Sequence, residues 1–232
     1  MKGVSAWINP SAIVLCILAA AHAGVAWENR TRRPELEIIT APPSEAARAA
    51  MSFGDQQFLY RLWTMDLQNA GDTGGRMTPM RYYNYSNVIG WLDALGELDP
   101  RGEHHLYLAV RYFSQTPETD DVRRLMEFVE RDVARSPATK WFWLTQALVI
   151  AEKRLRDLPY ALQISERLAT LNPADAPNWV FMMPAILMEK MGRLPAAESA
   201  IRQVRAQRGQ GMRTDELLFI DSFIQRLHGS PG

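Results

Sequence analysis

The residues of this chain whose types could support metal binding or catalysis are a histidine pair and a glycine-rich segment. His104 and His105 are adjacent, and neighbouring side chains on a helix point about 100° apart, so the pair cannot readily hold one metal ion. We expect a surface or capping role for both histidines. The segment 71–75 lacks the Lys-Ser/Thr that completes a phosphate-binding loop, and it does not lead from a strand into a helix. These residues therefore predict neither a metal nor a cofactor.

Carboxylates gather between positions 120 and 132. Glu127, Glu130 and Asp132 occur with arginines at helical spacing, which predicts a solvated helix face. Asp120 and Asp121 are expected to cap the start of that helix, where acidic charge is favoured. The sequence contains no HExxH, GxSxG or CxxC pattern and no arrangement of a nucleophile beside a base. We therefore expect that the protein is not an enzyme.

Methionine and aromatic side chains favour recognition over catalysis. Flexible thioethers adapt to varied apolar partners, and tryptophan is enriched at binding hot spots. The alternative is that these side chains fill irregular gaps in the core around Pro184. The residues are Met182, Met183, Met188 and Met191 together with Trp141, Phe142, Trp143 and Trp179.

The composition excludes some classes of protein. The 232 residues are 47% apolar, and 26 basic residues balance 26 acidic ones, so the basic excess of a nucleic-acid-binding protein is missing. Arginine outnumbers lysine by 22 to 4, which we interpret as a GC-rich bacterial genome. The one cysteine, Cys16, lies in an N-terminal apolar run, so the rest of the chain has neither disulfides nor thiolate metal sites.

Helical apolar spacing runs through the body of the chain, and no segment shows the alternation typical of a strand. Ser44 is expected to begin a helix that continues to about Asn69, and the glycines of segment 71–75 end it. The later helices are expected at 85–98, 105–113, 120–135, 139–155, 159–171, 177–191, 195–207 and 214–228.

The first 28 residues form an apolar segment with two interpretations. Ala21-His22-Ala23 fits the cleavage site of a signal peptide. Trp7 and Trp27, however, are 20 residues apart, about 30 Å on a helix, with tryptophan at both ends as in a retained transmembrane helix. We favour a transmembrane anchor at residues 1–28 and keep the signal peptide as the alternative.

Residues 29–43 mix Pro, Glu and Ile without a helical period and predict a linker to a helical domain over 44–230. The arginines at 30–33 favour a cytoplasmic domain, because basic residues stay on that side of a membrane. A lone N-terminal anchor, by contrast, commonly acts as an export signal. We expect a single-pass protein of a bacterial inner membrane whose soluble domain is periplasmic, with a cytoplasmic domain as the alternative.

A recurring proline divides the body into units. Pro100, Pro137 and Pro173 are separated by 37 and 36 residues, and each follows a segment with helical spacing. A fixed period of this length is typical of stacked helix pairs, an architecture that binds other molecules. The motif Leu-Pro-x-Ala also recurs, ending at Ala161 and again at Ala197.

These features resemble the tetratricopeptide repeat, whose second helix carries a small residue and ends with a proline twelve positions later. The resemblance covers residues 50–210 and is best over 138–210. The chain departs from the family in its longer period, in Pro184 inside a first helix and in Gly209 where a further proline is expected. The resemblance implies an α-solenoid of about four helix pairs.

The resemblance also implies a protein partner held in a groove on the first helices of the pairs. Position in the repeat selects part of this site, and the aromatic, methionine and tyrosine-rich segments supply the rest. The candidate partner-binding residues are Trp143, Gln146, Lys153, Asn178, Trp179, Met182, Met183, Lys190, Tyr82, Tyr83 and Tyr85.

Three functions compete on this basis. The first is a membrane-tethered scaffold that binds a protein partner and supports the assembly of a membrane-associated complex. The second is a permanent, non-catalytic subunit of a membrane complex, whose exposed apolar surface would be an obligate interface. The third is a small-ligand-binding or enzymatic domain that uses the segment 81–85.

Overall fold

The structure is a computed structural model that describes residues 10–29, 38–72, 75 and 77–229. The chain divides into two compact units, residues 1–37 and residues 38–232. Every regular element of the described residues is helical, apart from one isolated bridge between Asp72 and Met77. The prediction of an all-α protein is confirmed.

The N-terminal unit contains one described element, α1 (Pro10–Asn29). Within the described part of the chain, no helix combines the length and the apolar character that a membrane crossing requires. The structure therefore gives no support to the predicted transmembrane helix. Trp7, which was expected to mark one end of that helix, lies outside the described residues.

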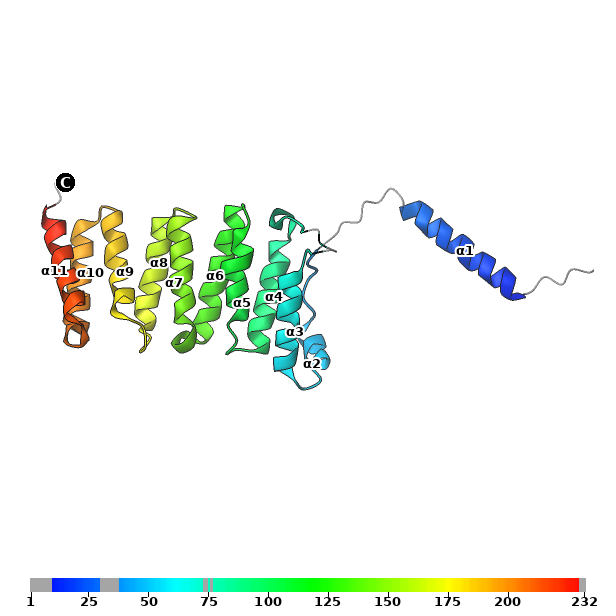
Figure 1. Ribbon diagram of the computed structural model, residues 1–232, viewed down its shortest axis with the longest axis horizontal. Coiled ribbons are helices and arrows are strands. Elements are labelled where there is room, and N and C mark those ends of the chain that lie inside the picture. The colour runs from blue at the N-terminus through cyan, green and yellow to red at the C-terminus, as the bar shows by residue number, and fades with distance from the viewer. Residues whose placement is uncertain (1–9, 30–37, 73–74, 76, 230–232) are drawn as a thin grey trace, which may run out of the picture. The chain divides into compact units, whose positions relative to one another are not determined.

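The second unit is a succession of helices joined by short connections (Figure 1). They are α2 (Glu45–Met51), α3 (Gln56–Asn69), η1 (Met80–Tyr82), α4 (Tyr85–Leu98), α5 (His104–Tyr107), η2 (Leu108–Tyr112), η3 (Phe113–Gln115), α6 (Thr119–Arg135), α7 (Pro137–Lys153), α8 (Leu158–Leu171), α9 (Asn178–Lys190), α10 (Leu194–Arg208), η4 (Gly209–Gly211) and α11 (Thr214–Gly229).

The start of this unit differs from the prediction in two ways. The single helix expected from Ser44 to Asn69 is broken between α2 and α3, where Phe53 and Gly54 adopt positive φ angles and Asp55 caps the new helix. The end of the predicted linker, residues 38–43, is packed on α4. Ile39 is buried, and the indole N–H of Trp91 donates to the carbonyl of Thr40 at 2.7 Å. The boundary between units therefore lies after Glu37.

Side-chain caps and prolines fix where the helices begin. The carboxylate of Asp157 accepts from the backbone N–H of Tyr160, and Asn84 caps α4 in the same way. Proline occupies the first turn of α7, α8 and α10, where its missing N–H costs no hydrogen bond. Helix α6 begins one residue earlier than expected, so Asp120 and Asp121 lie in its first turn and neither is its N-cap.

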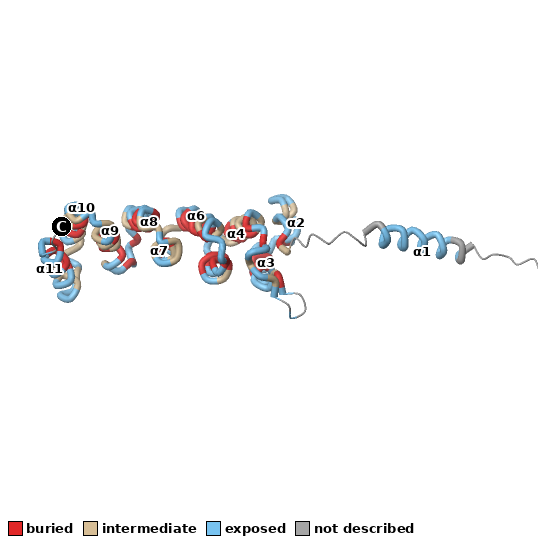
Figure 2. Tube along the Cα trace, turned by 90° about the horizontal axis from the view of Figure 1, so that it is seen from above, coloured by how far each residue is buried: buried red, intermediate tan, exposed pale blue. Residues whose placement is uncertain are grey.

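The helices form two layers in which each helix packs mainly on its neighbours in sequence. Figure 2 shows α3, α7 and α11 on one side and α4, α6, α8 and α10 on the other. We call α3, α5 with η2, α7, α9 and α11 the first helices, and α4, α6, α8 and α10 the second helices. Ala161 and Ala197 are fully buried at equivalent positions of α8 and α10, where a small side chain lets two helices approach closely.

One stretch departs from regular helix. After a single turn of α5, residues 108–112 form a π-helix, which accommodates one extra residue in a turn. Leu108, Ala109 and Val110 are all buried there. The extra residue changes which later side chains face outward, so Ser114 is buried and Gln115 is exposed.

Candidate functional site: the exposed face of the first helices

The exposed side chains of the first helices follow the same spacing from one helix to the next. Phe142, Gln146, Val149 and Lys153 follow each other at helical spacing along the outer side of α7. The same spacing recurs 37 positions later on α9 and a further 36 positions later on α11. We call this surface the first-helix face. It consists of Tyr107 and Arg111 before α7, of Phe142, Gln146, Val149 and Lys153, of Trp179, Met183, Ile186 and Lys190, and of Asp215, Phe219, Ser222 and Arg226.

Aromatic rings occupy equivalent positions near the beginnings of three first helices. Tyr107, Phe142 and Trp179 are 45%, 45% and 47% exposed, so each presents about half of its surface to solvent. The side chain of Arg111, one turn after Tyr107, donates to Gln146, one turn after Phe142, at 2.6 Å. This hydrogen bond bridges the two helices that carry Tyr107 and Phe142. We call Tyr107, Phe142 and Trp179 the aromatic row.

A hollow of about 230 Å³ lies between α9 and α11, beside the last ring of the aromatic row. Trp179, Met183, Ile186 and Phe219 form most of its apolar lining, and the buried side chain of Met182 also borders it. Its size and apolar lining suit a bulky hydrophobic side chain of a partner.

Carboxylates lie along the edge of the first-helix face beside the aromatic row, and we call this edge the acidic rim. Three of its carboxylates accept hydrogen bonds from neutral donors: Glu103 from the indole of Trp143 at 2.8 Å, Asp175 from the indole of Trp141 at 3.0 Å, and Glu216 from the amide of Asn178 at 3.0 Å. Among the described residues, none of the three carboxylates forms an ion pair. Within this part of the chain, Glu103 and Asp175 are therefore not neutralised by an ion pair, whereas Glu216 also accepts from the backbone N–H of Arg213 at 2.9 Å and interacts with the charge of that arginine.

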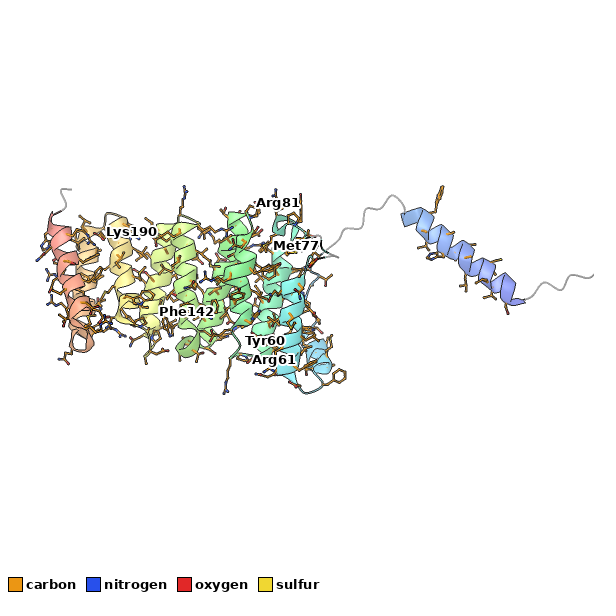
Figure 3. All side chains as sticks on the ribbon, viewed as in Figure 1. Tyr60, Arg61, Met77, Arg81, Phe142 and Lys190 are labelled. Carbon is orange, nitrogen blue, oxygen red and sulfur yellow. The ribbon has the colours of Figure 1, made fainter. Side chains whose placement is uncertain are left out.

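At the opposite rim of the first-helix face, the charged side chains form ion pairs with one another. In Figure 3, Phe142 lies toward the lower end of α7 and Lys190 toward the upper end of α9. The ammonium of Lys190 lies 2.6 Å from Glu152, and Arg226 lies 2.8 Å from Glu189. Partial burial opposes ionisation of Glu152, but the hydrogen bonds and charges of Lys190 and Lys153 hold its pKa below the ordinary value. The first-helix face therefore has one unpaired acidic rim and one rim of ion pairs.

The structure brings five of the predicted binding residues to the first-helix face. They are Gln146, Lys153, Trp179, Met183 and Lys190. Asn178 lies at the acidic rim, where it is bound to Glu216. The residues missed by the sequence-based selection are Tyr107, Arg111, Val149, Ile186, Asp215, Phe219, Ser222 and Arg226, and Phe142 was noted only as an aromatic residue. The repeat offsets of 35 to 37 residues between successive first helices are the signal that could have identified them.

Other predicted binding residues lie elsewhere. Trp143, Met182, Tyr83 and Tyr85 are buried in the core. The hydroxyl of Tyr85 donates to the carbonyl of Phe113 at 2.8 Å, and burial raises its pKa to about 12. Tyr82 is 68% exposed but lies in η1, away from the first helices that form the face. The tyrosine-rich segment is therefore mainly structural.

A buried ionic cluster corrects two predictions about charged residues. Asp132 and His105 are fully buried, and Lys140 is 1% exposed. The ammonium of Lys140 lies 2.8 Å from Oδ2 of Asp132, and His105 Nε2 lies 3.2 Å from the same oxygen. Asp132 thus belongs to no solvated face, and His105 has no surface role. Glu130 is also buried, where it accepts from the hydroxyl of Tyr160 at 2.8 Å.

The cluster joins four helices. Because an ionised carboxylate only accepts hydrogen bonds, His105 donates through Nε2 to Asp132, and its Nδ1 shares a hydrogen bond with the hydroxyl of Tyr60 of α3 at 3.2 Å. Burial opposes ionisation of Asp132, but His105 and Lys140 lower the pKa of this carboxyl below its ordinary value of 3.8. The cluster is buried, and its hydrogen bonds and ion pair hold α3, α5, α6 and α7 together.

A larger hollow, about 820 Å³, lies on α8, α9 and α10. Its aromatic residue is Phe181, and the guanidinium of Arg208 already covers that ring at 3.3 Å from the centroid. Arg208 also bonds to Asn172 across the hollow. The first-helix face, by contrast, leaves its aromatic rings open to a partner.

The described residues contain no group of three or more His, Cys, Asp or Glu side chains that could hold a metal ion. Comparisons with family models, with curated proteins and with solved structures find no match to this chain. Its description therefore rests on its own structure, which is an all-helical array with an aromatic and aliphatic face on its first helices.

Proposed function

We propose that the protein is a non-catalytic scaffold, built as a tetratricopeptide-like array of helix pairs, that binds a segment of a protein partner on the first-helix face. The observation that carries the proposal is the aromatic row, because three large aromatic side chains stay half-exposed at equivalent positions of three repeats. Single exposed apolar side chains are ordinary on a protein surface, whereas apolar side chains grouped on one face indicate an interaction site. The scaffold would support the assembly of a membrane-associated complex.

The membrane tether in this proposal rests on the uncharged run at residues 3–27 of the sequence. Protease protection in intact spheroplasts, followed by N-terminal sequencing, tests it. A domain that is digested in intact spheroplasts, from a chain whose N-terminus is intact in the membrane fraction, supports a periplasmic, anchored protein, whereas a protected domain indicates the cytoplasmic alternative. A new N-terminus near Ala23 in a released protein identifies a cleaved signal peptide.

Site-specific photo-crosslinking in cells tests the binding face. A benzoylphenylalanine placed at Phe142 or at Met183 is expected to yield a discrete adduct with a partner protein. The matched control position is Gln203, an exposed residue of the second helix α10. The adduct from Phe142 is expected to weaken when Trp179 is changed to Ala. Equal adducts at all three positions, or none from the first-helix face, would contradict the proposal.

The outer side of α3 favours a second candidate, a permanent subunit of a larger complex. Phe58, Leu62 and Met65 are 61%, 43% and 63% exposed, and they lie at helical spacing opposite the buried side of α3. Obligate interfaces are apolar in this way. Native electrophoresis after mild detergent extraction separates the candidates, because a permanent subunit migrates with its complex and a transient scaffold is recovered alone.

A further inference from the structure

We infer that the segment held on the first-helix face is a proline-rich stretch in the polyproline II conformation that also carries Lys or Arg; the inference rests on the proposed function. Three observations lead to this chemistry. They are the half-exposed rings of the aromatic row, the free polar group on one of the rings, and the unpaired carboxylates beside them.

The aromatic row favours an extended ligand. Its rings lie at equivalent positions of successive first helices, and side chains bridge these helices, Arg111 to Gln146 and Lys190 to Glu152. A segment that contacts several rings must therefore cross several helices, and a polyproline II segment is extended without internal hydrogen bonds. Aromatic-lined grooves are surfaces on which such segments dock.

The aromatic row also suits proline chemically. Proline offers an apolar ring to an aromatic face, and its pre-formed conformation loses little entropy on binding. The carbonyls of a polyproline II segment have no internal hydrogen bonds and need donors. In the described residues, the indole N–H of Trp91, Trp141 and Trp143 each donates to a protein oxygen, whereas that of Trp179 has no such partner. Trp179 can therefore donate to a carbonyl of the ligand.

The acidic rim selects the charge of the ligand. Glu103, Asp175 and Glu216 accept only from neutral donors within the described residues, and all three lie beside the aromatic row. The carboxylates of the opposite rim, Glu152 and Glu189, are already paired with Lys190 and Arg226. Unpaired carboxylates on one side of the rings attract a ligand with Lys or Arg at that side and disfavour an acidic ligand.

Fluorescence anisotropy with labelled peptides tests the inference on the full chain in mild detergent. The probe is decaproline flanked by two arginines at each end. One comparison peptide keeps the arginines and replaces the prolines by Gly and Ser, and another keeps the prolines and replaces the arginines by glutamates. The probe is expected to bind at least tenfold more tightly than either comparison peptide.

Variants of the protein test whether the probe binds at the first-helix face. Trp179→Ala and Phe142→Ala are each expected to weaken binding of the probe about fivefold or more, and Asp175→Asn to weaken it about threefold. Tyr82→Ala is the control, because Tyr82 is exposed and lies outside the face. Circular dichroism verifies that each variant is folded. Unchanged affinity in both aromatic variants, or equal binding of the Gly/Ser peptide, would overturn the inference.

The failure of the inference can be distinguished from the failure of the proposed function. Photo-crosslinks from Phe142 and Met183 with no binding of the probe refute the polyproline ligand and leave the scaffold in place. Absence of both results refutes the scaffold as well. Binding that depends on the aromatic row and on the charge of the peptide supports both.

Discussion

The two halves of the helical array hold their helices together by different chemistry. From α7 to α11 the contacts are made mainly by apolar side chains, aromatic ones such as Phe223 included, with Ala161 and Ala197 fully buried at equivalent positions. From α3 to α7 a buried ionic cluster of His105, Asp132 and Lys140 lies within the apolar core. Regular repetition needs only small residues at fixed positions, whereas the irregular half is fixed by specific polar contacts.

The largest effect is expected from breaking the ionic cluster. Asp132→Asn leaves Lys140 buried with no opposite charge, and removing one partner of a buried pair costs about 3–5 kcal/mol of stability. Urea unfolding monitored by circular dichroism measures the loss. Glu189→Gln, which removes an exposed pair with Arg226, is the control and should cost less than about 1 kcal/mol. Equal losses in the two variants would show that the cluster has no special role.

The same cluster predicts a dependence on pH. Because the pKa of Asp132 is lower in the folded chain than its ordinary value of 3.8, its ionisation stabilises the fold above that pH. This contribution is lost as the pH falls from about 4 through the lowered pKa. The difference in unfolding free energy between the native chain and Asp132→Asn should therefore shrink in acid and stay constant between about pH 5 and 7. A constant difference at all values would contradict the role assigned to the carboxylate.

The repeated half is most sensitive to an increase in side-chain volume. Ala161→Leu or Ala197→Leu inserts three carbon atoms into a closed contact and should cost about 1–3 kcal/mol. Ala196 lies beside Ala197 on α10 but is exposed, so Ala196→Leu provides a matched control with little effect. Thermal melts of the three variants measure the differences. Similar melting temperatures for Ala196→Leu and Ala197→Leu would argue against close helix packing at this position.

Helix caps should contribute equally in both halves. Asp157 caps α8, and Asp55 caps α3 by accepting from the backbone N–H of Phe58 at 2.8 Å. Replacing either aspartate by Ala should cost about 1 kcal/mol. Asp157→Ala also removes the ion pair with Arg123, which adds only a fraction of that amount because both side chains are partly exposed. Chemical unfolding of the two variants makes this comparison.

The smallest effect is expected on the exposed side of α3. Met65→Ser should change the stability of the isolated chain by no more than about 0.5 kcal/mol, because Met65 is 63% exposed. If the chain is a permanent subunit, the same variant should instead reduce its recovery with the complex after extraction. A large loss of stability in the isolated chain would show that Met65 is covered within the protein.

The sequence identified the helices and their alternation, because apolar spacing and prolines are local signals. It placed α7 to α11 within two residues at either end. It did not reveal the ionic cluster, because Asp132 shares its helical spacing with carboxylates that face solvent, and only the packing of α5 and α7 on α6 decides which is buried. The break at Phe53 was also missed, although it is a local feature in which Phe53 and Gly54 adopt positive φ angles and Asp55 caps the next helix. The π-helix after Tyr107 was missed as well.

The candidate site was predicted in outline. The resemblance to helix-pair repeats selected the first helices, and five of the eleven selected residues lie on the face. Met182 and Trp143 were also selected, but both are buried in the core. Each is the neighbour in sequence of an exposed residue of the face, and one position along a helix turns a side chain by about 100°. The repeat offset contained the missing information, because it aligns Trp179 with Phe142 at the same exposed position.

The neighbour-to-neighbour packing of the array has a mechanical consequence. In the described part of the chain helix α11 packs mainly on α10 and α9, so a pull on the C-terminus would peel the helices away one after another, as in other solenoids. The peeling would pass through the aliphatic contacts of α10, α9 and α8 and then meet Lys140 at the start of α7, whose extraction requires a buried charge to be separated from Asp132. A chain under tension would therefore retain the helices from α3 to α7 longest.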